Sequence, residues 1–248
     1  MTGLQPKKRI GIAGRCWRAP LYERQIQSAI AHSNDWVAAA RHILSISMPL
    51  LNKRLALALF LMASPAAAGS ITHEGISFSD ESGDFTILNV TGTGSLADPF
   101  VVVEDITGKE PILIIRGLDE RFGNRIGSNS PFGMALVKLA VNHSGLAWYG
   151  YRIEVRSRPI SPSPDSDGVS FAQGWGKRQT MGSNGFRHLV VTDTPYDALN
   201  FDDGWIDESH SVSFRIFITD LRLKPEIYLV QEPETDIACA WPGRAALC

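Results

Sequence analysis

An acidic segment near the end of the chain carries the side chains best suited to chemistry. Asp202, Asp203, Asp207 and Glu208 place four carboxylates within seven residues, around Trp205. Carboxylates crowded in this way repel one another unless water solvates them or a cation neutralises them. Carboxylate oxygens are also the ligands that calcium prefers. The segment therefore predicts either a solvated acidic loop or a calcium site in which Asp202, Asp203 and Asp207 are the metal ligands.

Three tryptophans form a second candidate site. Trp148, Trp175 and Trp205 each lie in a glycine-containing turn or at the end of an expected strand. Flat aromatic faces beside carboxylates suit the stacking of sugar rings, whereas the competing interpretation buries each ring with its N–H group hydrogen-bonded. The three residues are therefore candidate ligand-binding residues, with a glycan as the ligand class.

No catalytic or cofactor motif stands out elsewhere in the chain. The sequence lacks G-x-S-x-G, H-E-x-x-H, a P-loop and a G-x-G-x-x-G that opens a helix. No catalytic residue is assigned on this basis, and no cofactor other than calcium is considered. A noncatalytic protein is favoured, and the alternative is a secreted hydrolase that uses Asp202, Asp207 and Glu208 to supply a carboxylate pair.

Cysteines are few and lie near the two ends of the chain. Cys239 and Cys248 both fall within the last ten residues, with Pro242 and Gly243 between them. Proline and glycine suit a turn, so the two cysteines are a candidate disulfide in an oxidising compartment. Such a bridge would hold a C-terminal tail, residues 237–248, and would leave the core of the protein unchanged.

The elements that position these residues are expected to be short strands. The clearest alternation is at 149–156, where Tyr151, Ile153 and Val155 point one way while Arg152 and Glu154 point the other. A period of two indicates a strand with one face in the core, because a helix would spread these residues around its circumference.

Two further segments show the same period. At 134–142 the alternation predicts Val137 and Leu139 in the core and Lys138 on the opposite face. Segment 134–156 as a whole is predicted to form a β-hairpin. At 212–219 the alternation places Phe214 and Ile216 inside, and Arg215 outside.

The rest of the chain adds strands and turns. Thr194 and Pro195 predict a single helical turn over 195–199, and 201–208 is predicted to be a loop. About eight to ten short strands with no helix to cover them predict an all-β fold, an antiparallel β-sandwich of the Ig-like or jelly-roll-like kind over residues 69–236. The alternative is a closed β-barrel.

Residues 48–68 have the pattern of a secretory signal peptide. Lys53 and Arg54 precede nine apolar residues at 55–63, and Ala66, Ala67 and Ala68 form a small-residue cleavage pattern. Nine apolar residues are too few to span a bilayer, which takes roughly 20, so no transmembrane anchor is predicted here. The expected product is an exported protein, periplasmic or extracellular, that begins near Gly69.

The residues before and after this segment differ in charge. Residues 1–68 hold nine basic and two acidic side chains, whereas residues 69–248 hold 15 basic and 24 acidic ones. The basic prefix 1–47 is interpreted as lying upstream of a true start at Met48, or else as a long basic or transit-type leader. The acidity of the remainder argues against nucleic acid as a partner.

The function that follows is a general one. The sequence predicts an exported, noncatalytic β-sandwich module that binds a ligand or associates with the cell surface or envelope, with a glycan or an envelope protein as its partner. A structural component of the envelope is a further alternative, because a sandwich fold by itself does not select a function.

Overall fold

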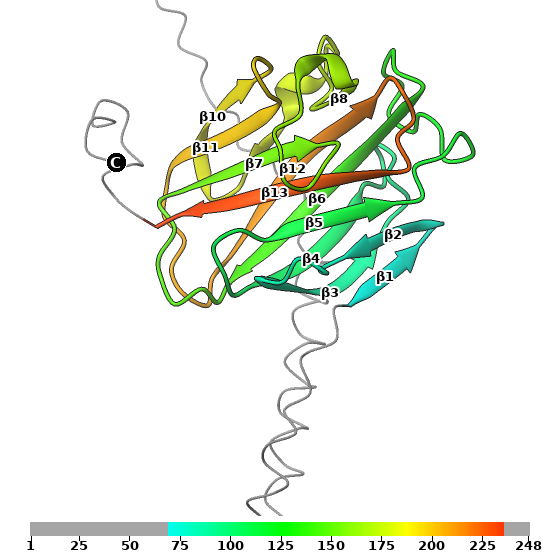
Figure 1. Cartoon of the computed structure of the whole chain (residues 1–248). Helices are drawn as coiled ribbons and strands as arrows, with labels where there is room; N and C mark the ends of the chain where they lie inside the picture. Colours follow the sequence, from blue (N-terminus) through cyan, green and yellow to red (C-terminus); the bar gives the residue numbers. More distant parts are fainter. Residues whose placement is uncertain (1–68, 236–248) are drawn as a thin grey trace, which may run out of the picture. The chain divides into compact units, whose positions relative to one another are not determined.

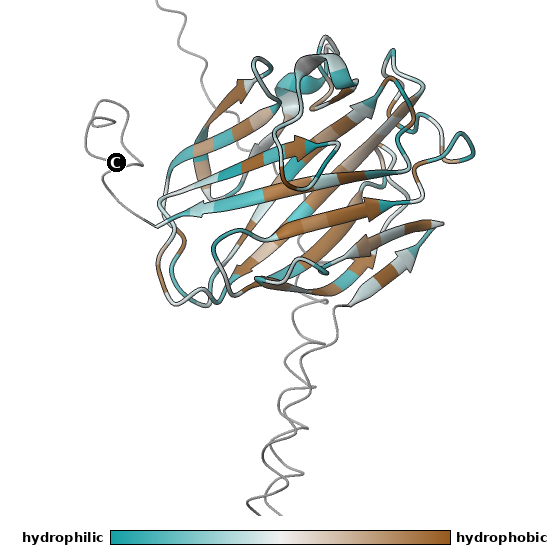
Figure 2. Cartoon of the chain, in the orientation of Figure 1, coloured by the Kyte–Doolittle hydropathy of each residue, from teal (hydrophilic) through white to brown (hydrophobic). Residues whose placement is uncertain are grey.

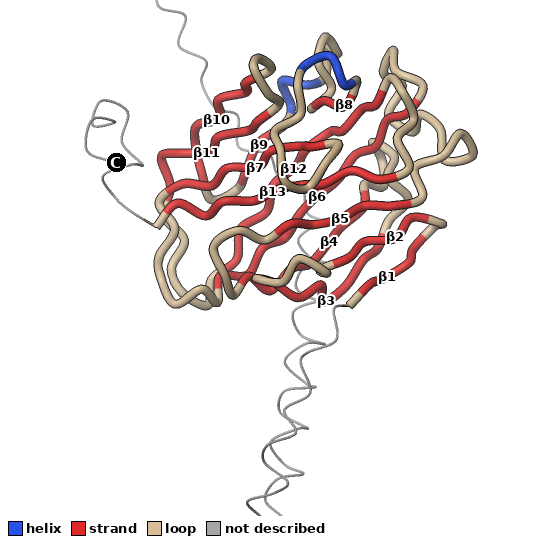
Figure 3. Tube along the Cα trace, viewed as in Figure 1, coloured by secondary structure: helices blue, strands red, loops and turns tan. Residues whose placement is uncertain are grey.

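Thirteen strands and two single-turn 3₁₀ helices are present within residues 69–235, the part of the chain that the computed structural model describes. Figure 3 shows that strands dominate and that the helical turns lie together beside β8. The strands are β1 (Ser70–His73), β2 (Ile76–Ser79), β3 (Phe85–Thr91), β4 (Phe100–Ile106), β5 (Ile112–Arg116), β6 (Phe132–Asn142), β7 (Gly150–Arg156), β8 (Val169–Ser170), β9 (Gly182–Ser183), β10 (Phe186–Thr192), β11 (Ala198–Gly204), β12 (Ser211–Asp220) and β13 (Glu226–Glu234). The helical turns are η1 (Asp165–Asp167) and η2 (Arg178–Thr180).

The strands form two sheets that pack against each other, as Figure 1 shows. The seven-stranded sheet has the order β1-β2-β5-β13-β7-β11-β10, and the six-stranded sheet has the order β3-β4-β6-β12-β8, with β9 also paired to β12. Neither sheet closes on itself, so the predicted β-sandwich is confirmed and the barrel alternative is wrong.

One pair of neighbours departs from the antiparallel pattern. β4 and β6 are parallel, with Val102 opposite Lys138 and Glu104 opposite Ala140. Between β4 and β6 the chain crosses to the other sheet, forms β5 there and crosses back. After these two crossings β6 runs in the same direction as β4. The six-stranded sheet is therefore mixed.

The core lies between the two sheets. Tyr151, Ile153 and Val155 on β7 face Phe214 and Ile216 on β12 across it, as predicted, and all five are fully buried. Figure 2 shows the corresponding bands of hydrophobic and hydrophilic residues along most strands, whereas β5 is hydrophobic over most of its length. Arg152, Glu154 and Arg215 lie on the outer faces, which agrees with the alternation.

The predicted hairpin at 134–156 is wrong. β6 belongs to the six-stranded sheet and β7 to the other, so the turn between them crosses from sheet to sheet. The face assignment within β6 is also wrong. Met134, Leu136 and Ala140 join the central core, and Lys138 points inward with them, whereas Val137 and Leu139 lie on the outer face of the sheet, where they are nevertheless buried.

Two local predictions also need correction. The segment after Pro195 forms no helical turn, because β11 begins at Ala198. The predicted loop at 201–208 is half strand, since β11 continues to Gly204.

Within residues 69–235 no helix has the length and apolar character needed to cross a bilayer. The predictions for the signal peptide at 48–68, the prefix 1–47, the disulfide between Cys239 and Cys248 and the tail 237–248 concern residues outside the described range.

Candidate functional site

Two loops meet at the end of the sandwich that we call the Trp205 end, formed by residues 143–149 and 205–210. Trp148 and Ile206 form an isolated antiparallel bridge, with two backbone hydrogen bonds of 2.9 Å. The Asn142 side chain donates to the carbonyl oxygens of Leu146 and Ile206, at 2.8 and 3.1 Å. The Glu208 carboxylate accepts from the backbone N–H of Gly145 at 2.8 Å. These contacts hold both loops in a fixed arrangement.

Trp205 presents its ring to solvent at this end. Its side chain is 62% exposed, and its indole Nε1 donates to Oδ1 of Asp207 at 2.9 Å. The ring centroid lies 5.7 Å from that of Tyr149, at an interplanar angle of 44°. A large aromatic side chain is usually buried, so an exposed indole whose N–H group is tied to its own loop is available for stacking with a ligand.

The other two tryptophans occupy different environments. Trp148 is fully buried, donates from Nε1 to Oγ of Ser144 at 3.0 Å and packs against Tyr151 at 5.3 Å. Trp175 is half-buried and makes an edge contact of 5.2 Å with Phe217. In the described part of the chain, no ring contact joins the three tryptophans. Trp148 offers no exposed face to a ligand, and the ligand-binding roles of all three stay predictions.

The three predicted calcium ligands have separate partners. Asp202 lies 2.8 Å from Nδ1 of His188, Asp203 pairs with Arg187 at 3.7 Å, and Asp207 accepts the Trp205 hydrogen bond. Asp203 has a φ of 56°, although the β10–β11 pairing keeps its register on both sides of this residue. Among residues 69–235, no three His, Cys, Asp or Glu side chains gather closely enough to hold a metal ion. The calcium site stays a prediction, with no preformed ligand cluster to support it.

A carboxylate that the sequence did not single out lies next to this end. Glu234, on β13, is opposite Gly150, on β7. A Cβ atom added to Gly150 would lie 2.5 Å from Oε2 of Glu234, so the missing side chain of the glycine leaves room for the carboxylate. The sequence does not reveal Glu234 as a candidate, because its position beside Gly150 depends on the pairing of β13 with β7.

The charge on Glu234 is unfavourable in the folded protein. Burial raises the pKa of its carboxyl above the ordinary value of 4.5, and the nearby charges of Asp202 and Glu232 raise the pKa further. A raised folded-state pKa means that protonation favours folding, so this contribution is complete below about pH 4.5 and is lost as the pH rises through the folded-state pKa.

Glu234→Gln removes this titration while keeping the shape of the side chain. We expect the variant to melt at a higher temperature than the wild type at neutral pH, and the difference to disappear at acid pH. Scanning calorimetry of both proteins across that range measures the difference. A difference in melting temperature that stays constant with pH would mean that the pKa of Glu234 is not raised in the folded protein.

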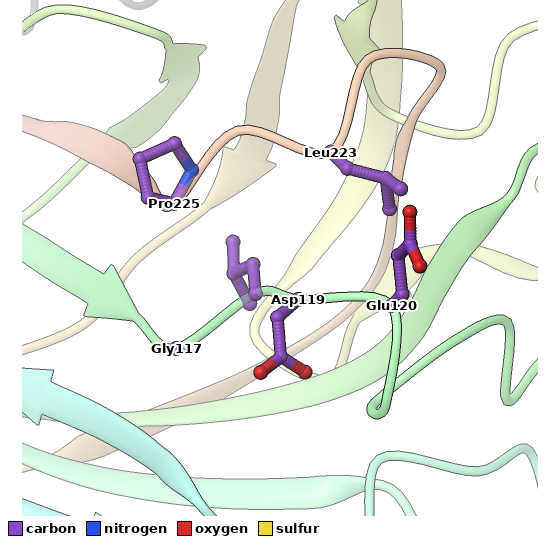
Figure 4. Close-up of a pocket in the computed structure, with 6 residues that line it drawn as sticks. Gly117, Asp119, Glu120, Leu223 and Pro225 are labelled. Atoms are coloured by element: carbon purple, nitrogen blue, oxygen red, sulfur yellow. The ribbon is translucent and has the colours of Figure 1, made fainter.

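One surface pocket of 330 Å³ lies at the opposite end of β12 and β13. Gly117, Leu118, Asp119, Glu120, Leu223 and Pro225 line it. Figure 4 shows the Glu120 carboxylate beside Leu223, and the Asp119 carboxylate turned away from it. The Asp119 side chain accepts hydrogen bonds from the backbone of Arg121 and Phe122, so it is committed to its own loop. The lining therefore offers few polar groups that converge on a ligand.

A cluster of four polar side chains lies inside the core, and we call it the core polar cluster. Glu104 and Lys138 come from β4 and β6 of one sheet, and Tyr151 and Gln231 come from β7 and β13 of the other. All four are fully buried. Lys138 Nζ lies 2.8 Å from Oε2 of Glu104, and its ammonium also faces the Tyr151 ring at 5.3 Å. The sequence does not reveal this cluster, because its members lie on four separate strands.

Comparison of the chain with protein-family models, with curated proteins and with solved structures gives no match.

Proposed function

We propose that this protein is an exported, noncatalytic binding module whose ligand site is the Trp205 end. The observation that carries the proposal is the exposed Trp205 ring, held by Asp207 beside Tyr149. A glycan is the ligand class that suits these groups best, because the apolar face of a sugar ring stacks on an indole while its hydroxyls bond to nearby carboxylates.

Export is supported by a contact at the first described residue. The backbone nitrogen of Gly69 lies 2.5 Å from Oδ1 of Asp80, whose side chain is 6% exposed. Cleavage after Ala68 would convert this nitrogen into a charged amine, and a hydrogen bond to a carboxylate is stronger when the donor is charged. Asp80 is therefore well placed to receive a new N-terminus at Gly69.

The hydrolase alternative draws less support from the geometry. Glu208 accepts a hydrogen bond from the backbone of Gly145, which joins the two loops, and Asp207 accepts one from the Trp205 indole within its own loop. Asp202 is paired with His188. A glycosidase needs two carboxyl groups on opposite sides of a bound sugar ring, and these three side chains have other partners.

Trp205→Ala tests the proposal directly. Affinity electrophoresis in gels that contain different polysaccharides should show retardation of the wild-type protein in at least one gel. The variant should bind that polysaccharide about tenfold more weakly or worse, since loss of one stacked aromatic ring removes at least about 1.4 kcal/mol. Leu221→Ala is the matched control, because Leu221 is 63% exposed and follows the opposite end of β12.

Two outcomes would contradict the proposal. In the first, no polysaccharide retards the wild-type protein, which would favour a structural role in the envelope. In the second, Trp205→Ala is retarded as strongly as Leu221→Ala, so that binding occurs at another surface.

A further inference from the structure

The core polar cluster surrounds one side-chain amide with groups that can react with it. Oε2 of Glu104 is 2.8 Å from Nζ of Lys138 and accepts a hydrogen bond of 3.0 Å from Nε2 of Gln231. The hydroxyl of Tyr151 donates to Oε1 of Gln231 at 2.7 Å and lies 3.4 Å from Nζ of Lys138. Oε2 of Glu104 therefore contacts both the lysine amine and the amide nitrogen of Gln231. The Tyr151 hydroxyl contacts both the lysine amine and the amide oxygen of Gln231. Glu104 and Tyr151 therefore hold the amine and the amide in one hydrogen-bonded network.

We propose that Lys138 and Gln231 join in an isopeptide bond that the folded protein forms by itself, with Glu104 as the proton carrier. The new bond connects Nζ of Lys138 to Cδ of Gln231. Because Lys138 lies on β6 and Gln231 on β13, the bond links the two sheets covalently across the core. Figure 1 shows β13 in front of β6, on opposite layers of the sandwich.

The reaction balances without an outside reagent. Glu104 takes one proton from the Lys138 ammonium, and the neutral amine attacks Cδ of Gln231. The carbonyl oxygen gains negative charge and is stabilised by the Tyr151 hydroxyl, as in an oxyanion hole. Glu104 returns its proton to Nε2, which leaves as ammonia when the carbonyl re-forms. The second proton of the former amine then passes to Glu104, which ends as a neutral acid.

The surroundings favour each of these roles. Burial lowers the pKa of Lys138, against the opposing effect of Glu104, and this increases the fraction of neutral amine. Burial raises the pKa of Tyr151 well above its ordinary value, and the charge of Glu104 adds to this, so the hydroxyl keeps the proton that it donates. Reactive groups that are held in position by the fold also need no bimolecular encounter.

The product also removes a cost that the unreacted core carries. Two buried charges must be taken out of water, and their attraction often does not repay this fully. Oε1 of Glu104 is buried and has no hydrogen-bond partner among the described residues, so the carboxylate is incompletely paired. In the product the lysine is an uncharged amide and Glu104 is an uncharged acid. The bond therefore replaces a buried ion pair, whose desolvation is unfavourable, with neutral groups.

High-resolution mass spectrometry of the purified full chain tests the proposal. We expect the wild-type protein to be lighter than the mass calculated for its own N-terminus by one ammonia molecule, about 17 Da. Trypsin should fail to cleave after Lys138, and the peptide that contains Lys138 should be found joined to the peptide that contains Gln231. Lys138→Met should have its calculated mass and yield both peptides separately.

Tyr151→Phe is a second variant that keeps the ring in the core. It should form the bond more slowly, so that freshly made protein contains unlinked chains. Tyr228→Phe is the matched control, because the Tyr228 hydroxyl bonds to Glu226 at 2.5 Å and belongs to no part of the cluster. Tyr228→Phe should be linked as completely as the wild type.

Three results would overturn the proposal. A wild-type protein at its full calculated mass, with normal cleavage after Lys138, would mean that the cluster remains noncovalent. A loss of one water molecule, about 18 Da, with a link to Glu104 would mean that the carboxyl group and not the amide reacts. A loss of ammonia that maps to other residues would mean that the core polar cluster is not its source.

Discussion

Replacing Phe214 with alanine is expected to lower the free energy of unfolding by about 3–5 kcal/mol. The ring lies at the centre of the sandwich, where its centroid is 4.7 Å from that of Tyr151 and 4.8 Å from that of Phe201. It is fully buried, and its partners belong to the opposite sheet. The substitution would therefore remove apolar contacts and leave a cavity between the sheets, because the close-packed strands cannot move together far enough to fill it.

Urea unfolding followed by circular dichroism measures this loss. Leu88→Ala is the control on the same sheet, because Leu88 lies on β3 and is 46% exposed. An exposed side chain away from special features should change the free energy of unfolding by about 0.5 kcal/mol or less. An equal decrease in the free energy of unfolding for Phe214→Ala and Leu88→Ala would show that Phe214 is not at the centre of the core.

Replacing Glu154 with alanine is expected to cost about 3–5 kcal/mol, although this residue is charged and lies on an outer face. The Glu154 side chain is only 1% exposed. It accepts hydrogen bonds from Nε of Arg156 at 2.7 Å and from Nη2 of Arg152 at 2.7 Å. Removal of the carboxylate leaves the partly buried Arg156 without its acidic partner, and leaves Arg152 paired with Glu232 alone.

Asp203→Asn serves as the comparison for this prediction. Asp203 pairs with Arg187 at 3.7 Å, and both side chains are largely exposed. Exposed pairs contribute only about 0–1 kcal/mol, so this variant should unfold at nearly the same urea concentration as the wild type. If Glu154→Ala also unfolds at nearly the same urea concentration as the wild type, the network around Glu154 contributes no more to the free energy of unfolding than a surface ion pair does.

The fold could be predicted from the sequence where neighbouring residues determine the outcome. At 149–156, the strict alternation of Tyr151, Ile153 and Val155 with charged residues identifies both the strand and its buried face. The hairpin prediction failed because period and turn residues identify strands but not their partners. A short loop such as 143–149 can join paired strands of one sheet, or it can carry the chain across the sandwich, as it does here.

Lys138 shows a second limit of the sequence. A lysine is rarely buried without a partner, so the alternation of β6 was assigned with this residue outward. Its partner, Glu104, lies on another strand, and only the parallel pairing of β4 with β6 brings the two together. The same holds for Glu234, whose position beside Gly150 depends on the pairing of β13 with β7. The sequence presents Trp205 and Trp148 as equivalent candidates at a turn or strand end, yet Trp205 is exposed and Trp148 is buried.

The position of β13 has a consequence for how the protein bears mechanical load. β13 is hydrogen-bonded to β5 on one side and to β7 on the other. A force applied along this strand from its Glu234 end acts on both ladders in shear, so their hydrogen bonds must break together. β1 pairs with β2 at the edge of the same sheet, and a force across it can peel the bonds one at a time. The sandwich should therefore resist extension far more strongly when pulled through β13 than when pulled through β1.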